Sequence, residues 1–371
     1  MNNATRTELS AFLDSTVREL RIPHSICACT ENHALVYHHT AGIAGGEPGD
    51  DSVFHLYSAT KTLTAAAAMQ LVERGLLDLD APVARYLPEY EAMYLRKGKS
   101  CVPAENPLTV AHLLSMQGGF DYILHTPEVD RLIAESGGSA GTREIVREWS
   151  KKKLRFEPGT HFMYSLCLDV FGGVLEAACG MTVGQWMKEN IFEPLGMQST
   201  TFAPDEGMVQ RMMLLYRLMP DGTIAEENKR ENFCRLTESF ESCGGGLYGT
   251  LADLMRFADA MACGGTGANG ARILSERSIS LMNRNRLGPQ SLIDYRNRYS
   301  RPGYGYGLGV RTSLGDGTAE PEGVFGWDGA AGAHVMIDPN RHTAMVFLMH
   351  VLDMEVLYDH VFNKMDAIIY R

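Results

Sequence analysis

The N-terminal segment 1–20 carries apolar residues at helical spacing, at Leu9, Phe12, Leu13, Val17 and Leu20, and has no continuous apolar stretch. We therefore predict an amphipathic helix there rather than a signal peptide. The runs SICACT and ALVYHH that follow are β-prone and are separated only by Glu-Asn-His, which predicts a hairpin.

An alanine-rich helix is predicted to begin near Ser58 and to end at Gly75, because glycine is common just past a helix end. From about residue 78 to 260 the patterns are mostly helical, with loops rich in Pro and Gly. The helical segments predicted there are LTVAHLLSMQ, EVDRLIAES, TREIVREWSKK, LDVFGGVLEAAC, TVGQWMKENIF and TLADLMRFADAMA. After Arg301 the runs YGYGLGVRT, GAHVMID and TAMVFLMH are strand-like, and EVLYDHVFNKMDAII predicts a final amphipathic helix.

These elements predict a single domain, 1–371, of the α+β class. Residues 1–77 and about 261–371 would form a mixed α/β lobe, and about 78–260 an inserted, mainly all-α lobe. We expect chemistry in a cleft between the two lobes.

Composition narrows the class of partner. A formal net charge of −11 argues against nucleic acid or an anionic membrane surface, and no apolar run approaches the ~18 residues of a membrane span. We expect a cytoplasmic protein that binds a small molecule, with no nucleic-acid or membrane partner. The oligomeric state is left open.

The cysteines and histidines predict neither disulfides nor a cofactor. The eight cysteines are scattered, without C-x-x-C or paired metal spacing, which favours buried small apolar residues. The histidines show no ligand spacing and there is no H-E-x-x-H, so no metal site and no organic cofactor are expected.

Three motif matches are discounted on context. Gly137–Gly141 fits G-x-S-x-G around Ser139, but the preceding residues are helical where a nucleophile elbow needs a strand. Gly265–Gly270 fits G-x-G-x-x-G, but it also follows a helix. Ser150 and Lys153 fit S-x-x-K in a highly charged segment, which shows how weak that four-residue pattern is alone.

A second S-x-x-K pair, Ser58 and Lys61, lies at the start of the apolar helix. Positions i and i+3 share a helix face, so the amine can reach the hydroxyl. A serine needs a base to become nucleophilic, and a lysine acts as one only where burial or positive charge lowers its pKa. By these residues alone, a nucleophile with its base and a helix-capping serine with a solvated lysine are almost equally supported.

Longer matches decide between these two interpretations. Six stretches, in order along nearly the whole chain, carry a resemblance to a known family. They are YSATKTLTAAAAMQLVERGLLDLDAPVARYLPEY, LTVAHLLSMQGGFDY, FEPGTHFMYSLCLDVFGGVLE, IFEPLGMQSTTF, GGGLYGTLADLMRFA and FGWDGAAGAHVMIDP. The chain resembles the serine β-lactamases and penicillin-binding proteins, in particular their class C-like branch. The resemblance implies an antiparallel sheet flanked by N- and C-terminal helices, with an inserted helical lobe.

The resemblance also implies roles for particular residues. Ser58 would be the acylated nucleophile and Lys61 its proton partner, and Tyr164 would be the tyrosine of the family's Tyr-x-Asn element. The backbone N–H groups of Ser58 and Ala330 would form the oxyanion hole. Whether Lys61 or Tyr164 is the formal base stays open, because coupled groups titrate as a unit.

The chain departs from the family pattern at two elements. Trp327-Asp328-Gly329 stands where Lys-Thr-Gly or His-Thr-Gly is usual, so the cation that binds a substrate carboxylate is missing. Leu166 replaces the asparagine of Tyr-x-Asn. Both changes resemble family VIII carboxylesterases and predict an apolar substrate pocket, although Trp327 has packing as an alternative role. Tyr122, in GGFDY, is expected either to line the pocket or to be structural.

The predicted function is a serine hydrolase acting on short-chain carboxylic esters through a Ser58 acyl-enzyme. β-Lactamase or D-amino-acid peptidase activity on the same residues is the main alternative. An acyltransferase and a catalytically silent binding protein also remain open.

Overall fold

The computed structural model describes residues 1–43, 47–98, 100–227, 232–299 and 301–371. A seven-stranded antiparallel sheet lies at its centre, in the order β10-β11-β12-β13-β14-β1-β2. Its strands are β10 (Tyr304–Tyr306), β11 (Arg311–Ser313), β12 (Phe325–Asp328), β13 (His334–Asp338), β14 (Thr343–Met349), β1 (Ser25–Glu31) and β2 (Ala34–Ala41).

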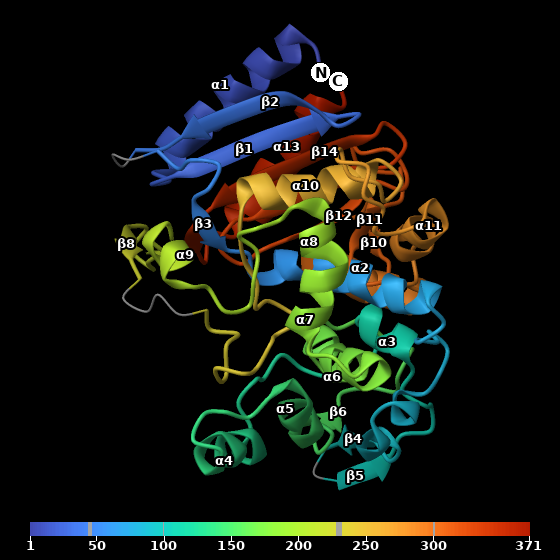
Figure 1. The fold of residues 1–371 in the computed structure, drawn as a ribbon. Helices are drawn as coiled ribbons and strands as arrows, with labels where there is room; N and C mark the ends of the chain where they lie inside the picture. The colour runs from blue at the N-terminus through green and yellow to red at the C-terminus, as the bar shows by residue number, and fades with distance from the viewer. Residues whose placement is uncertain (44–46, 99, 228–231, 300) are drawn as a thin grey trace.

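The two ends of the chain meet in this sheet. β1 pairs with β14, so that Ser25 lies opposite Met349 and Glu31 opposite Thr343. The predicted N-terminal helix is α1 (Asn3–Leu20), and the predicted hairpin is β1 with β2. The final helix is α13 (Phe362–Ile369), entered through a π-helical turn, η5 (Leu357–Val361). Both termini lie side by side (Figure 1).

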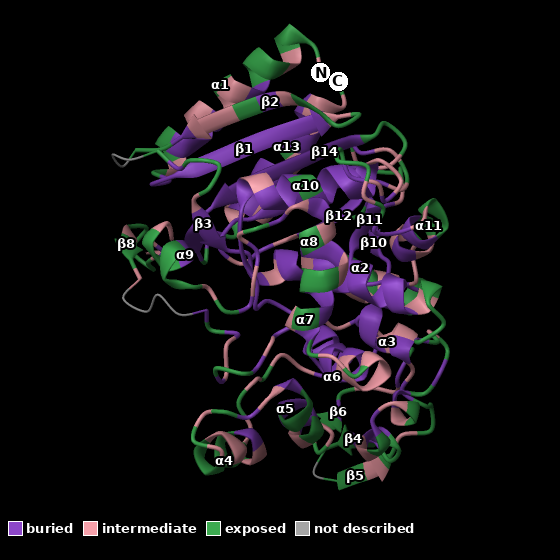
Figure 2. Ribbon diagram, viewed as in Figure 1, coloured by how far each residue is buried: buried purple, intermediate pink, exposed green. Residues whose placement is uncertain are grey.

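Successive side chains along each strand point to opposite faces of the sheet, and apolar side chains on both faces form two hydrophobic cores. Cys27 and Cys29 pack with α1 and α13, whereas Ile26 and Ala28 belong to the larger core that includes α2 (Thr60–Glu73) and α10 (Leu251–Ala262). Strands β1 and β14 and helix α10 are accordingly almost wholly buried (Figure 2).

Helices and short strands make up the rest of the chain. The helices are α3 (Val110–Leu114), α4 (Pro127–Glu135), α5 (Thr142–Trp149), α6 (Cys167–Cys179), α7 (Val183–Met187), α8 (Glu193–Leu195), α9 (Glu206–Gln210), α11 (Glu276–Asn283) and α12 (Pro289–Tyr299), with the turns η1 (Tyr57–Ala59), η2 (Val83–Arg85), η3 (Pro88–Tyr90) and η4 (Lys188–Phe192). The helices predicted for LTVAHLLSMQ, EVDRLIAES, TREIVREWSKK and LDVFGGVLEAAC are confirmed as α3 to α6. The sequence did not predict the small sheets β5-β4-β6 and β15-β7-β8, formed by β4 (Tyr94–Lys97), β5 (Ser100–Pro103), β6 (Lys153–Leu154), β7 (Tyr216–Leu218), β8 (Ile224–Glu226) and β15 (Val351–Leu352).

Chain segments near the predicted lobe boundary lie against the sheet. Strand β3 (Val53–His55) pairs with β9 (Tyr248–Thr250), and α10 packs on β14 and β1. The predicted boundary near residue 260 falls at the end of α10, whereas α10 itself contacts the sheet. The division into two lobes stays a prediction.

Neither the G-x-S-x-G match around Ser139 nor the G-x-G-x-x-G match at Gly265–Gly270 follows a strand. Ser139 lies in the turn between α4 and α5, and its hydroxyl donates to the Ser136 carbonyl at 2.8 Å, so no strand precedes it. Gly265–Gly270 follows α10 as a loop. Among the described residues no single helix is long and apolar enough to cross a membrane, although α6 with residues 183–195, bent by 74°, passes by length and composition.

All eight cysteines are free. Five are buried and two half-buried, but Cys101 is exposed on β5, so the prediction of buried cysteines is wrong at that position.

Candidate active site

Ser58 lies in the 3₁₀ turn η1, which connects β3 to the buried helix α2. The preceding residue, Tyr57, has φ +44°, a strained value for a residue with a side chain. Neither η1 nor α2 has a side-chain N-cap, and the Ser58 hydroxyl instead accepts hydrogen bonds from Lys61 and Tyr164. The structure therefore decides against the helix-cap interpretation.

Lys61 is fully buried in the first turn of α2. Its Nζ donates to Ser58 Oγ at 3.2 Å, to the Tyr122 hydroxyl at 3.4 Å and to the Gly244 carbonyl. Among the described residues no carboxylate forms an ion pair with it. The solvated lysine of the alternative interpretation is thus excluded, since burial of an ammonium requires directed partners.

Asp169 on α6 supports Lys61 through the Gly244 peptide, and this residue was not predicted from the sequence. Its Oδ1 accepts from the Ser242 hydroxyl at 2.6 Å and from the Gly244 N–H at 2.9 Å, while the Gly244 carbonyl accepts from Lys61. Burial raises the pKa of the Asp169 carboxyl, and the Lys61 ammonium opposes that rise. An acidic residue inside the apolar run LDVFGGVLEAAC was the available signal.

Tyr164 completes the group around the serine. Its hydroxyl donates to Ser58 Oγ at 2.6 Å and accepts from Trp327 Nε1 at 3.2 Å. The Tyr164 ring stacks on Tyr122 and on Trp327, at centroid distances of 5.4 and 5.5 Å. Trp327 is therefore both a packing residue and a hydrogen-bond donor to the Tyr164 hydroxyl.

Tyr122 has a different place from the one expected for a pocket residue. Its hydroxyl accepts from Lys61 and its ring packs on Tyr164, but it does not line the cavity beside Ser58. Burial raises the pKa of Tyr122 well above its usual range, so the phenol stays protonated. It acts on the site by positioning Lys61 and Tyr164.

A cavity of about 340 Å³ opens beside Ser58. It is lined by Ser58, Tyr164, Trp327, Asp328, Gly329 and Ala330, together with Tyr295, Arg298, Tyr299, Arg301, Glu355 and Tyr358. Chain segments as distant as η1, α12, β12 and η5 thus meet at one place.

Glycine is required at the end of β12. A Cβ on Gly329 would lie 2.3 Å from the Leu56 carbonyl oxygen, so the strand end packs directly against the backbone that leads into Ser58. The Tyr358 hydroxyl donates to the Gly329 carbonyl at 2.8 Å and fixes the peptide that precedes Ala330. The predicted oxyanion residues, Ser58 and Ala330, accordingly share the wall of one cavity.

Leu166 does not fulfil the predicted role. It is fully buried in the large core at the start of α6 and does not line the cavity. The expectation that it contacts substrate is wrong, because a leucine at this position turns its side chain into the core.

Asp328 lines the cavity but is committed to an ion-pair network. Its carboxylate accepts from Arg301 at 3.1 Å, from Arg311 at 2.9 Å and from His334 at 2.6 Å. Burial alone would raise the pKa of the Asp328 carboxyl, but these three cations hold it well below its usual range. Asp328 therefore anchors Arg301 at the cavity wall rather than offering a free carboxylate to substrate.

Two further buried groups of this network titrate at unusual pH. Burial opposes protonation of His334, but the carboxylates of Asp366 and Asp328 outweigh it and raise the pKa of His334 to about 9. Burial and the nearby Asp366 raise the pKa of Glu320 to about 8, although Arg311 lies 3.8 Å away. At neutral pH the histidine is therefore charged and Glu320 is protonated.

Two guanidinium groups in the cavity were not predicted. Arg301 is only 5% exposed, and it also donates to the Tyr358 carbonyl. Arg298 is exposed, at 5.2 Å from the Tyr299 ring centroid. The cavity is therefore less apolar than expected. No residue of β12 replaces the lysine of Lys-Thr-Gly, but Arg298 on α12 and Arg301 after it bring positive charge to the same cavity. The cluster RNRYSR was the available signal.

Comparison with known proteins places the chain in a family. The chain belongs to the Beta-lactamase family, whose model matches residues 10–361. It is 29% identical to Esterase EstB of Burkholderia gladioli, over 89% of this chain and 86% of that protein. It is also 29% identical to the Lovastatin esterase of Penicillium rubens, over 82% of this chain and 80% of that protein.

Solved structures of related proteins have a similar fold. The structure of EstCE1, described as a hydrolase with promiscuous acyltransferase activity, superposes with a TM-score of 0.80 at 24% identity and covers 99% of this chain and 98% of that one. The β-lactamase-like fold predicted from sequence is therefore confirmed.

Proposed function

We propose that this enzyme is a serine hydrolase that cleaves carboxylic esters through an acyl-enzyme on Ser58, as a member of the family VIII carboxylesterase type. The observation that carries the proposal is the pair of hydrogen bonds to Ser58 Oγ, from Lys61 Nζ at 3.2 Å and from the Tyr164 hydroxyl at 2.6 Å. A hydroxyl held between two proton-transfer groups, beside a cavity, is the arrangement that nucleophilic catalysis needs.

The reaction proceeds by double displacement. With one proton removed from the Lys61–Tyr164 pair, this pair accepts the Ser58 proton as Oγ attacks the ester carbonyl carbon, and the backbone N–H groups of Ser58 and Ala330 stabilise the oxyanion. The C–O bond to the alcohol then breaks, and Tyr164 returns a proton to the leaving oxygen. Water attacks the acyl-enzyme in the same way, releasing the acid and restoring the serine hydroxyl.

Ester rather than β-lactam substrates are favoured by two features. Trp327 and Asp328 replace the residues that would bind a β-lactam carboxylate, and the Asp328 carboxylate is engaged by Arg301, Arg311 and His334. Two of the relatives named above are esterases. Aromatic rings of Tyr299 and Trp327 in a cavity of about 340 Å³ suit a short acyl group.

Acyl transfer is the second candidate, because EstCE1 is described as having this activity. An acyl-enzyme that passes its acyl group to an alcohol in place of water uses the same residues. We propose a cytoplasmic location and a small ester as the partner.

The test compares turnover of p-nitrophenyl butyrate with turnover of nitrocefin, a chromogenic β-lactam. We expect the ester to be hydrolysed faster than nitrocefin. This activity should be lost in Ser58→Ala and retained in the matched control Ser139→Ala. Dominant nitrocefin hydrolysis would reverse the order of the two substrates. Butyl butyrate formed when butanol is added would show acyl transfer.

A further inference from the structure

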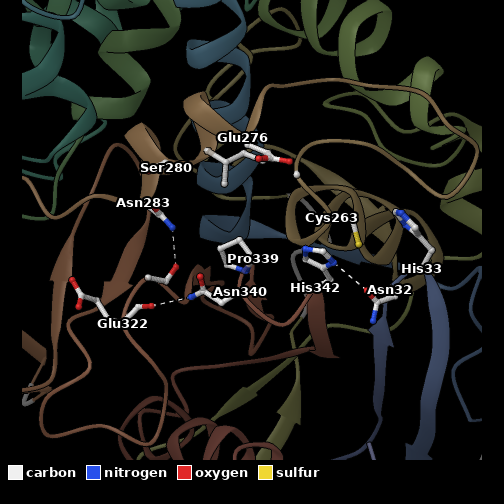
Figure 3. A pocket seen from close by; sticks show the side chains of 13 residues that line it. Asn32, His33, Cys263, Glu276, Ser280, Asn283, Glu322, Pro339, Asn340 and His342 are labelled. Atoms are coloured by element: carbon white, nitrogen blue, oxygen red, sulfur yellow. Dashed lines mark hydrogen bonds between the residues drawn. The ribbon is translucent and has the colours of Figure 1, made fainter.

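A second polar pocket lies away from the Ser58 cavity and shares no lining residue with it. It has a volume of about 640 Å³ and includes His33, Cys263 and His342 among its lining residues. The His33 ring and the Cys263 sulfur lie on the same side of it (Figure 3). This pocket has no role in the ester chemistry proposed above.

Two distant segments bring His33 and Cys263, which line this pocket, within reach of Asp259, which does not line it. His33 lies in the turn between β1 and β2, where it has φ +67°, and Asp259 and Cys263 lie one helical turn apart at the end of α10. His33 Nδ1 is 2.7 Å from Asp259 Oδ2, and the donor atoms of all three residues lie within 4.8 Å of one another. Since His33 and Asp259 are 226 residues apart in the chain, no ligand spacing in the sequence indicates the group.

The buried carboxylate has an unused coordination position. Asp259 is 5% exposed, and its Oδ1 has no hydrogen-bond partner among the residues that the structure describes. A buried oxygen without a partner is costly and calls for an explanation. A cation at this position would satisfy it.

We propose that His33, Asp259 and Cys263 form a binding site for a divalent transition-metal ion of borderline softness, with Zn²⁺ as the best fit. One imidazole nitrogen, one carboxylate oxygen and one thiolate are ligand types that zinc takes in tetrahedral sites. The thiolate and the carboxylate together balance the two positive charges of the ion. The fourth position faces the pocket and takes water.

The geometry requires only small side-chain movements. Ligand atoms around a tetrahedral zinc ion are roughly 3.3–3.8 Å apart. His33 and Asp259 therefore separate by less than about 1 Å, and Cys263 approaches by a similar amount. Their hydrogen bond is replaced by two bonds to the metal, and the thiol proton is released to solvent.

Metal binding would tie the β1–β2 turn to the end of α10. In this structure the contact between the two elements at this point is the pairing of the exposed His33 with the buried Asp259. A bound ion that favours the folded chain raises its apparent stability by mass action. The site is therefore structural or regulatory, and it is independent of the proposed ester chemistry.

The test uses the full chain without a polyhistidine tag. Co²⁺ is titrated as a spectroscopic probe, because a cobalt–thiolate bond gives a near-ultraviolet charge-transfer band, and Zn²⁺ is then added to displace it. Thermal unfolding with and without Zn²⁺ is the second readout. We expect a saturable one-equivalent cobalt band that zinc abolishes, and a higher Tm with zinc.

Variants separate this site from adventitious binding. Cys263→Ser abolishes the band, and His33→Ala weakens binding at least about tenfold, because even an outer-shell partner is worth 10- to 100-fold in affinity. The exposed cysteine variant Cys101→Ser is the control for the thiol. His125→Ala, from an exposed His–Asp pair at 2.6 Å, is the control for the imidazole. Absence of a band in the wild-type chain, its persistence in Cys263→Ser, or its loss in either control overturns the proposal.

Discussion

Replacing Tyr164 by phenylalanine removes one hydroxyl from the active site and retains the ring. The hydroxyl donates to Ser58 Oγ at 2.6 Å and accepts from Trp327 Nε1 at 3.2 Å. The stacking contacts with Tyr122 and Trp327, at 5.4 and 5.5 Å, are kept by a phenyl ring. The variant therefore isolates proton transfer from packing.

The expected loss in rate is much larger than the loss in stability. A positioned proton-transfer group contributes roughly 10²- to 10⁴-fold in rate, or about 2.7–5.4 kcal/mol in activation free energy. The two lost hydrogen bonds contribute about 1 kcal/mol each to folding. We therefore expect kcat to fall at least about 100-fold, while Tm falls by a few degrees.

The assay measures kcat and kcat/KM for p-nitrophenyl butyrate and for ethyl butyrate, together with Tm. An ethoxide leaving group needs protonation more than nitrophenolate does, so the loss should be greater for ethyl butyrate. Tyr299→Phe is the matched control, because this ring lies in the same cavity but Ser58 receives its hydrogen bonds from Lys61 and Tyr164. A Tyr164→Phe variant within about tenfold of wild type on both esters, or an equal loss in Tyr299→Phe, would refute the assigned role.

Three further predictions concern the network and the cavity. Because the pKa of His334 is raised from 6.5 to about 9, its stabilisation is present below pH 6.5 and is lost as the pH rises through 9, which corresponds to about 3 kcal/mol. The pKa of Glu320 is raised from 4.5 to about 8, so the free energy of unfolding also falls as the pH rises from 4.5 to 8. Urea unfolding as a function of pH should show both losses, and Glu320→Gln should remove the second. A free energy of unfolding that does not change with pH would contradict both assignments. Gly329→Ala places a Cβ 2.3 Å from the Leu56 carbonyl oxygen. The strand end must then shift and displace the proposed oxyanion donor, the Ala330 N–H, so kcat for p-nitrophenyl butyrate should fall about 100-fold. Near-wild-type turnover would exclude that N–H as a donor. Arg298→Ala should lower kcat/KM about tenfold for a hemisuccinate ester but not for the matching butyrate ester, and an equal effect on both would show that this exposed guanidinium does not bind a substrate carboxylate.

Local pattern and long sequence matches were sufficient to predict the sheet, its terminal helices and the proximity of the three side chains around Ser58. Apolar spacing predicted α1, and the short β-prone runs predicted the hairpin of β1 and β2. The segment matches predicted Ser58, Lys61 and Tyr164, which the structure brings within hydrogen-bond distance.

What the sequence did not show depends on contacts between distant segments. Asp169 supports Lys61 only through the Gly244 peptide, which lies on another part of the chain. Arg301 reaches the cavity because Asp328 on β12 holds it there. Leu166 was assigned to the pocket by its position in a motif, but its side chain points into the core, which a motif alone does not reveal.

Covalent labelling tests whether Ser58 is the nucleophile of this enzyme. The protein is treated with a fluorophosphonate, and the modified residue is located by peptide mass spectrometry. We expect one adduct per chain on Ser58, formed at least about 100-fold more slowly in Lys61→Met, because this variant lacks one of the two groups that exchange a proton with Ser58. An adduct on Ser139 with Ser58 unmodified would exclude Ser58 as the nucleophile.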